Sequence, residues 1–239
     1  MSRRVLHLVN LEGGPAGLFL QPLLDRGYSI EDVNPNVGRL PASLDGYDAL
    51  LVTGGTANTH ETDRYPWLNQ EVGLLRQALE QSVPTFGLCL GAQLLTKAAG
   101  GEVYEAPQPE VGWYTVNAHP EAAADPVLGA MPHVFEAFQW HHYACGLPPG
   151  AIELANDEVC VQAFRIGSAA WATQFHIEVT RDILLGWQRE GTEELLSHGY
   201  DRDRFMTEMA RLLPAHEAVG REMANRFAAQ VDARTSAAA

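Results

Sequence analysis

The sequence has no apolar run long enough to cross a membrane and contains only three cysteines. A transmembrane helix needs about 20 apolar residues, whereas the first apolar run covers only residues 5–9 and no small-residue cleavage site follows it. The run therefore predicts a buried first strand rather than a signal peptide. Cys89, Cys145 and Cys160 are odd in number and lack disulfide-framework spacing, which favours free thiols and a cytoplasmic location.

Positive charge is also scarce. Lysine and arginine number 16 against 30 acidic residues, so the formal net charge is −14. Nucleic acids and anionic membranes attract basic surfaces, so this composition argues against both as partners. We interpret the acidity as a source of solubility.

Short apolar runs alternate with helical patterns over the first hundred residues. The run at residues 48–55 is continuously apolar and ends in a glycine pair, as buried parallel strands do. The alternation predicts an α/β fold with a mostly parallel central sheet and helices on both faces. The expected strands are residues 5–9, 29–33, 48–55 and 83–88, and the expected helices are residues 15–26, 67–82 and 90–99.

The pattern changes beyond residue 101. Shorter β-like segments follow, and two of them, residues 160–165 and 169–175, predict a hairpin. From Thr180 onward the chain is mostly helical in pattern. We therefore expect a small antiparallel β portion and C-terminal helices beside the main sheet. The length suits a single domain over residues 1–231, followed by a disordered tail at 232–239.

Cys89 lies between Gly87 and Gly91, where an apolar strand is expected to turn into a helix. Ligands of α/β sheets bind at the carboxyl ends of strands, and a helix N-terminus favours the reactive thiolate. The backbone N–H of Leu90 is a natural oxyanion donor, and the corner ending at Gly55 offers a second one. Cys89 is therefore a candidate nucleophile.

His176 and Glu178 lie far downstream and are two residues apart, so they share one face if the segment is extended. His176 would accept the thiol proton, and Glu178 would hold the imidazole in the required tautomer. A lone cysteine commonly fills a core, and a His-x-Glu pair alone is a weak signal. Together and in this order they predict a Cys89–His176–Glu178 triad.

The other cysteines and histidines have no comparable surroundings. Cys145 and Cys160 are expected to be structural. His141 and His142 are adjacent, but no second ligand cluster completes a metal site at a recognisable spacing. We therefore expect neither a metal nor another cofactor.

Eight short motifs occur in order between about residues 45 and 190. They are 54–55 (GG), 65–68 (YPWL), 87–93 (GLCLGAQ), 110–113 (EVGW), 140–141 (WH), 147–150 (LPPG), 162–164 (QAF) and 174–178 (QFHIE). With this set the chain resembles a free-standing class I glutamine amidotransferase, in the branch similar to the glutaminase domain of GMP synthase. The resemblance implies a flavodoxin-like fold.

The resemblance also implies a chemistry. The triad would attack a glutamine-type γ-carboxamide, form a γ-glutamyl thioester, release ammonia and let water release glutamate. Gly55 and Leu90 would be the oxyanion donors, and Gln93 would lie in the glutamine pocket. Three positions depart from the family pattern: Ile177 and Thr56 replace common prolines, and Tyr143 replaces an acidic residue. These departures concern specificity rather than the catalytic groups.

Three functions remain open. The leading one is a hydrolase that acts on glutamine or on a γ-glutamyl small molecule. The sequence has no Ser-Gly-Gly-x-Asp-Ser loop and no Gly-x-x-x-x-Gly-Lys loop, so a synthase would be a separate chain, and this chain its glutaminase subunit. The third is a non-catalytic binding or regulatory protein on the same scaffold. An α/β-hydrolase is disfavoured, because its acid normally precedes the histidine by a long interval.

Overall fold

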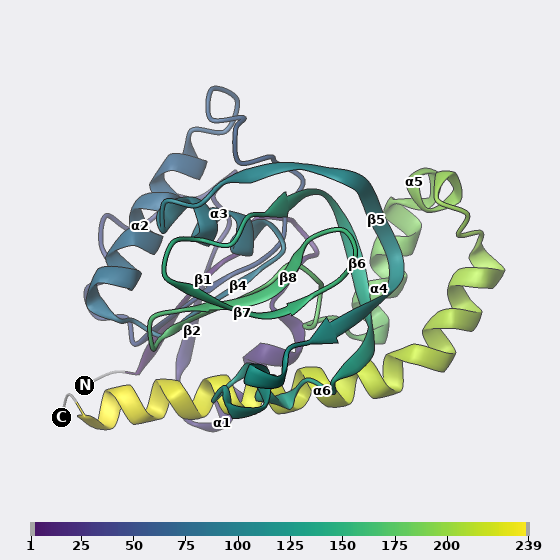
Figure 1. The fold of residues 1–239 in the computed structure, drawn as a ribbon. Coiled ribbons are helices and arrows are strands. Elements are labelled where there is room, and N and C mark those ends of the chain that lie inside the picture. Colours follow the sequence, from purple (N-terminus) through teal and green to yellow (C-terminus); the bar gives the residue numbers. More distant parts are fainter. Residues whose placement is uncertain (1–2, 238–239) are drawn as a thin grey trace.

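A computed structural model describes residues 3–237, and a nine-stranded sheet forms its centre, in the order β2-β1-β3-β4-β9-β8-β6-β5-β7 (Figure 1). The strands are β1 (Arg4–Leu8), β2 (Ser29–Val33), β3 (Ala49–Val52), β4 (Thr85–Leu88), β5 (Val103–Ala118), β6 (Val134–Cys145), β7 (Ala151–Asn156), β8 (Val161–Ile166) and β9 (Ala170–Thr173). The α-helices are α1 (Leu20–Asp25), α2 (Trp67–Gln81), α3 (Leu90–Ala98), α4 (Arg181–Glu190), α5 (Thr192–Ser197) and α6 (Arg202–Ala237). Three short 3-10 helices are η1 (Gly17–Phe19), η2 (Pro120–Ala124) and η3 (Leu128–Ala130).

The sheet is mixed rather than mostly parallel. β2, β1, β3, β4 and β9 pair in parallel, whereas every pairing that involves β5, β6, β7 or β8 is antiparallel. The α/β class is confirmed, but the prediction of a small antiparallel portion is wrong. That portion holds the two longest strands, β5 with 16 residues and β6 with 12. No α-helix lies between α3 and α4, so these strands lack the crossovers that parallel pairing requires.

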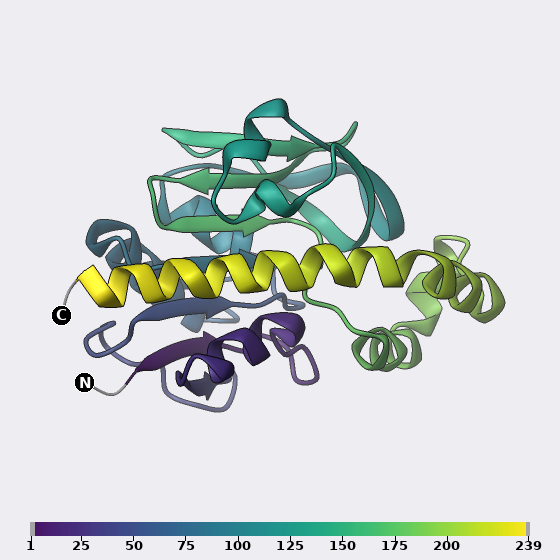
Figure 2. The same ribbon diagram turned by 90° about the horizontal axis from the view of Figure 1, so that it is seen from below.

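Helices cover both faces of the parallel half, as expected. Leu51 and Phe86 point to one face and pack in a core with Phe227 of α6. Leu50, the neighbour of Leu51 in β3, points to the opposite face and packs in a core with Leu75 of α2. Because side chains alternate across a strand, both residues of such a pair are buried, which explains the continuous apolar runs. Figure 2, which is seen from below, shows α6 running the length of the molecule in front of the sheet.

The C-terminal helix extends further than the sequence pattern suggested. α6 ends at Ala237, so the predicted disordered tail is wrong for residues 232–237, and residues 238–239 lie outside the described part. Asp232 accepts a hydrogen bond from the Tyr28 hydroxyl at 3.0 Å and pairs with Arg3 at 3.1 Å and Arg26 at 3.2 Å. These contacts attach the end of α6 to the N-terminal part of the fold. Neither α6 nor any other described helix is long and apolar enough to span a membrane.

Candidate active site

Cys89 occupies a strained turn between β4 and α3. Its φ of 51° and ψ of −106° lie in a region that non-glycine residues rarely adopt. The Cys89 N–H donates to the carbonyl of Thr173 in β9 at 2.9 Å, and its own carbonyl accepts from the N–H of Gln93 at 3.1 Å. These two bonds hold the turn between the sheet and the helix. Such strain is typical of a nucleophile placed on a strand-to-helix turn.

Two glycines allow α3 to approach the sheet at this turn. A Cβ on Gly91 would lie 2.1 Å from the carbonyl oxygen of Val52, and a Cβ on Gly87 would lie 2.7 Å from the carbonyl of Gly91. Backbone atoms cannot yield to contacts this short. Packing therefore requires glycine on both sides of Cys89.

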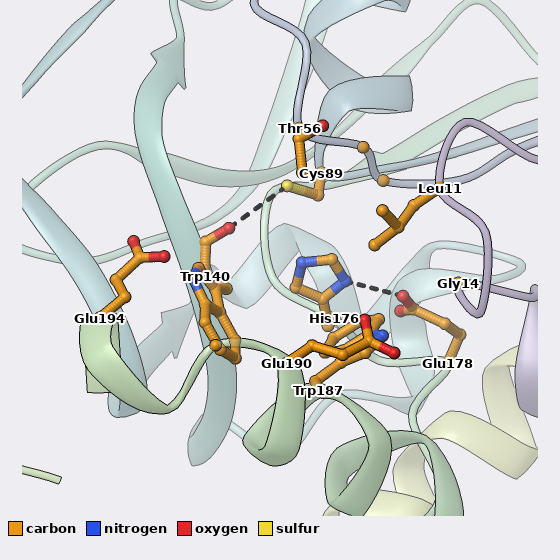
Figure 3. Close-up of a pocket in the computed structure, with 13 residues that line it drawn as sticks. Leu11, Gly14, Thr56, Cys89, Trp140, His176, Glu178, Trp187, Glu190 and Glu194 are labelled. Carbon is orange, nitrogen blue, oxygen red and sulfur yellow. Dashed lines mark hydrogen bonds and ion pairs between the residues drawn. The ribbon is translucent and has the colours of Figure 1, made fainter. Parts of the chain in front are cut away.

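His176 and Glu178 are brought together as predicted, although not on a strand. β9 ends at Thr173 and residues 177–178 form a turn, yet Nδ1 of His176 lies 2.7 Å from Oε1 of Glu178. Figure 3 shows the other ring nitrogen directed toward Cys89. Burial acts to lower the pKa of His176, but the negative charges of Glu178 and Cys89 outweigh it and raise that pKa. Glu178 therefore favours protonation of the His176 imidazole.

The loop that carries the triad histidine is held through its backbone carbonyls. The carbonyl of His176 accepts from Nε2 of His216 in α6 at 2.8 Å, and the carbonyl of Glu178 accepts from the N–H of Leu18 in η1 at 3.0 Å. Gly220 of α6 lies so close that a Cβ there would be 2.4 Å from the carbonyl oxygen of Ile177. Ile177 is fully buried, so packing restrains the position where the family commonly has proline.

The glycine corner after β3, Gly54 and Gly55, packs against both His176 and Cys89. A Cβ on Gly54 would lie 2.9 Å from Cε1 of His176 and 3.4 Å from Cβ of Cys89, and one on Gly55 would lie 3.0 Å from Cδ2 of Leu90. Leu90 begins α3, where backbone N–H groups lack intrahelical acceptors. Gly55 and Leu90 therefore flank Cys89, as oxyanion donors would, and their role stays a prediction.

Cys89 lies between two adjoining cavities that share Gly55, Thr56, Cys89, Trp140 and Glu194. The first, of about 280 Å³, is here named the His176 cavity and is further lined by Leu11, His176, Glu178, Trp187 and Glu190 (Figure 3). The second, of about 260 Å³, is named the Gln93 cavity and is further lined by Leu90, Gln93, His142 and Tyr143. The structure thus brings all six predicted site residues to these two cavities.

Gln93 is buried at the wall of the Gln93 cavity. Its Nε2 donates to the carbonyl of Tyr143 at 2.8 Å and lies 3.4 Å from Oε1 of Gln174. Gln174 is also close to the nucleophile, with Nε2 3.7 Å from the Cys89 sulfur. The backbone of Tyr143, rather than its ring, therefore fixes the amide of Gln93. A part for Gln93 in substrate binding remains a prediction.

A buried polar cluster lies beside the Gln93 cavity. Donor atoms of Glu110, His141 and Cys160 lie within 4.8 Å of one another, which is close enough to hold a metal ion. Nε2 of His141 is 3.0 Å from Oε2 of Glu110, and Gln162 donates to the same carboxylate oxygen at 2.9 Å. Burial lowers the pKa of His141 to about 4 and raises that of Glu110, which favours a neutral pair. We interpret the cluster as structural, and the absence of a metal stays a prediction.

The remaining cysteines match their predicted character. All three cysteines are free and buried, and Cys145 is completely enclosed. Burial raises the pKa of Cys145 to about 12 and also raises that of Cys160. Both thiols therefore stay protonated and unreactive near neutral pH.

Sequence reasoning missed most of the cavity walls. Trp187, Glu190 and Glu194 line the His176 cavity from α4 and α5, and Trp187 packs edge-on against His176 with ring centroids 4.7 Å apart. Leu11 lines it from the loop after β1. Their spacing carries no motif, because they come from separate elements that only the fold brings together. His216 and Gly220 were missed for the same reason.

Comparisons with known proteins identify the family of the chain. Residues 17–183 match the family model described as glutamine amidotransferase class-I. A glutamine amidotransferase-like protein of Salmonella typhimurium, YfeJ, is 29% identical over 80% of this chain and 82% of its own length. One of the subunits of the glutamine-hydrolysing GMP synthase of Sulfurisphaera tokodaii is 34% identical over 57% of this chain and 70% of its own length.

A γ-glutamyl-L-1-hydroxyisopropylamide hydrolase of Pseudomonas sp. is 28% identical over 65% of this chain, and the match spans only 55% of that relative. The crystal structure of a Thermotoga maritima glutamine amidotransferase superimposes with a TM-score of 0.85 and 26% identity, over 95% of this chain and 99% of the other. The chain therefore belongs to the class-I glutamine amidotransferase family, in the GMP synthase-like branch that its motifs resemble.

Proposed function

We propose that the chain is a hydrolase that cleaves the γ-amide bond of glutamine or of a γ-glutamyl compound through a thioester on Cys89. The observation that carries the proposal is the arrangement at the His176 cavity. Cys89 lies on a strained strand-to-helix turn, and His176 faces it with Glu178 2.7 Å behind the ring. This is the arrangement of nucleophile, base and orienting acid that acyl transfer requires.

The first half of the reaction forms the thioester. Cys89 transfers its proton to His176, and the thiolate attacks the γ-carbonyl carbon. The backbone N–H groups of Gly55 and Leu90 stabilise the oxyanion that develops. His176 then donates its proton to the amide nitrogen, the C–N bond breaks, and ammonia or an amine leaves.

The second half releases glutamate. His176, now neutral, removes a proton from a water molecule that attacks the thioester carbon. The oxyanion forms again at Gly55 and Leu90, the C–S bond breaks, and the departing sulfur recovers the proton from His176. Glu178 stabilises the imidazolium in both halves.

A second candidate function is that of a glutaminase subunit that supplies ammonia to a separate synthase chain. The similarity to the GMP synthase subunit of Sulfurisphaera tokodaii favours it, whereas the similarity to a γ-glutamyl amide hydrolase favours a self-sufficient enzyme. The third reading, a non-catalytic binding protein, has less support, because Cys89, His176 and Glu178 line one cavity and Glu178 lies 2.7 Å from His176.

The purified chain should be incubated with glutamine and with a panel of γ-glutamyl amides while ammonia, amine and glutamate are measured. Cys89→Ala should abolish turnover. Cys145→Ala, which alters an enclosed cysteine outside both cavities, should retain it. No turnover together with rapid alkylation of Cys89 would favour the role of a synthase subunit. No turnover with an inert Cys89 would favour the non-catalytic reading.

A further inference from the structure

The position of His176 determines which side of Cys89 receives the leaving group. If the proposed function holds, His176 must protonate the nitrogen that departs, so the departing amine lies on the His176 side of the nucleophile. The oxyanion donor Leu90 and the buried amide of Gln93 line the opposite cavity. The glutamyl part of the substrate therefore occupies the Gln93 cavity, and the leaving group occupies the His176 cavity.

The His176 cavity is far larger than ammonia requires. It measures about 280 Å³, whereas a water-sized molecule needs about 10–15 Å³ of such space. If glutamine were the substrate, almost all of this cavity would stay filled with solvent. An amine with a chain of several carbon atoms would instead displace water from apolar walls, which is favourable.

The walls of the His176 cavity are aromatic. Trp140 and Trp187 lie nearly perpendicular, with an interplanar angle of 87° and ring centroids 6.4 Å apart, and Leu11 lines the cavity as well. Tryptophan surfaces bury alkyl chains, and the faces of their rings also attract cations.

The charge of the cavity has one sign. Glu178 lies behind His176, and Glu190 and Glu194 project toward the cavity from the end of α4 and from α5 (Figure 3). No lysine or arginine is found among the described residues that line either cavity. Among the described side chains, only that of His142 pairs with the carboxylate of Glu194, and its Nε2 lies 2.6 Å from Oε1. A negative carboxylate entering this cavity would be repelled, and an ammonium group would be attracted.

We infer that the leaving group carries a second, positively charged nitrogen, so that the substrate is a γ-glutamyl diamine or polyamine rather than free glutamine. This inference rests on the proposed function. The alkyl chain of the amine packs against the walls formed by Trp140 and Trp187, and its distal ammonium lies near Glu190 and Glu194. Hydrolysis consumes one water and yields glutamate and the free diamine.

Three γ-glutamyl amides of equal chain length test the inference: those of 1,4-diaminobutane, butylamine and 4-aminobutyrate. We expect kcat/KM to be about tenfold higher for the diamine than for butylamine, and lowest for 4-aminobutyrate. Added salt should reduce the preference for the diamine, because screening weakens charge attraction. Glu190→Gln and Glu194→Gln should move the diamine-to-butylamine ratio toward one.

Glu193→Gln is the matched control, because Glu193 is exposed on α5 and is absent from the lining of both cavities. It should keep the wild-type ratio. Equal rates for the three amides, or fastest turnover of the 4-aminobutyrate amide or of glutamine, would overturn the inference while leaving the proposed function standing. Absence of Cys89-dependent turnover on every amide would overturn both.

Discussion

Nε2 of His216 lies 2.8 Å from the carbonyl oxygen of His176, so a helix beyond the family match at residues 17–183 holds the loop that carries His176. His216 is buried and packs edge-on against Trp113, with ring centroids 5.3 Å apart. The bond fixes the backbone of the histidine that must face Cys89. α6 thus contributes to the geometry of the proposed triad, and none of its described residues lines either cavity.

His216→Phe should therefore lower kcat by roughly tenfold, because small displacements of catalytic groups are costly, while KM changes little. It should also lower the free energy of unfolding by about 1–3 kcal/mol, since a buried carbonyl loses its donor. His216→Gln, whose amide can still donate, should recover part of kcat. His133→Phe removes a comparable bond to the carbonyl of Ala118 at 2.9 Å, outside both cavities, and should leave kcat unchanged. An equal loss of kcat in both phenylalanine variants would contradict a positioning role for His216.

Gly220→Ala tests the close packing of α6 on the same loop. The new Cβ would lie 2.4 Å from the carbonyl oxygen of Ile177, so the helix or the loop must shift. We expect a loss of about 1–3 kcal/mol in the free energy of unfolding, as in other overpacked sites, together with lower activity. Gly73→Ala in α2 is the control, because no atom lies within 4 Å of its new Cβ. It should stabilise the protein by up to about 1 kcal/mol through helix propensity. Thermal and denaturant unfolding would measure the stability of both variants. A Gly220→Ala protein with wild-type stability and activity would show that the loop tolerates displacement.

Glu178→Gln should change the pH profile as well as the rate. The negative charge of Glu178 is the largest influence that raises the pKa of His176, so its removal lowers that pKa. The general acid is lost when the pH rises above the His176 pKa, and the alkaline limb of kcat/KM should therefore move to lower pH. We also expect kcat to fall about 100-fold or more, because the imidazolium loses its stabilising partner. An alkaline limb at the wild-type pH would show that Glu178 does not set the protonation of His176.

Glu71 provides a test on stability. It is fully buried beside Asn10, whose Nδ2 lies 3.2 Å from Oε2, and burial raises the pKa of Glu71 to about 8. Between about pH 4.5 and 8 the unfolded chain ionises this carboxyl while the folded chain keeps it protonated, so the unfolded state binds fewer protons. The free energy of unfolding should therefore decrease as the pH rises through this range, by on the order of a few kcal/mol. In Glu71→Gln this contribution is absent, and the difference between the two proteins should grow with pH. A difference independent of pH would mean that Glu71 is ionised in the folded state.

The sequence predicted the parts of the site that local motifs encode. Three short patterns were each found where strand ends meet: Cys89 between its glycines, the corner at Gly55, and the His176–Glu178 pair. The reason given for the pair was wrong, because the segment is a turn held by α6 and η1 rather than an extended strand. Spacing alone cannot distinguish these two ways of bringing two side chains together.

Long-range relationships could not be predicted. The antiparallel half of the sheet was underestimated, because the 16 residues of β5 include prolines and charges that interrupt the apolar pattern. The polar end of α6 was interpreted as a tail, because Tyr28, Arg3 and Arg26, which hold Asp232, are about 200 residues away. Glu190 and Glu194 belong to no motif, and only the fold shows that they line the same cavity as Cys89.

The central claim is that Cys89 forms a covalent γ-glutamyl thioester, and intact-protein mass spectrometry tests it most directly. The chain should be mixed with excess γ-glutamyl diamine, quenched in acid within the first turnovers, and digested to locate the modification. We expect a γ-glutamyl adduct on Cys89 that accumulates before glutamate, disappears on further incubation and is absent from Cys89→Ala. Amide hydrolysis without any adduct on Cys89, or with the adduct on another residue, would contradict the account.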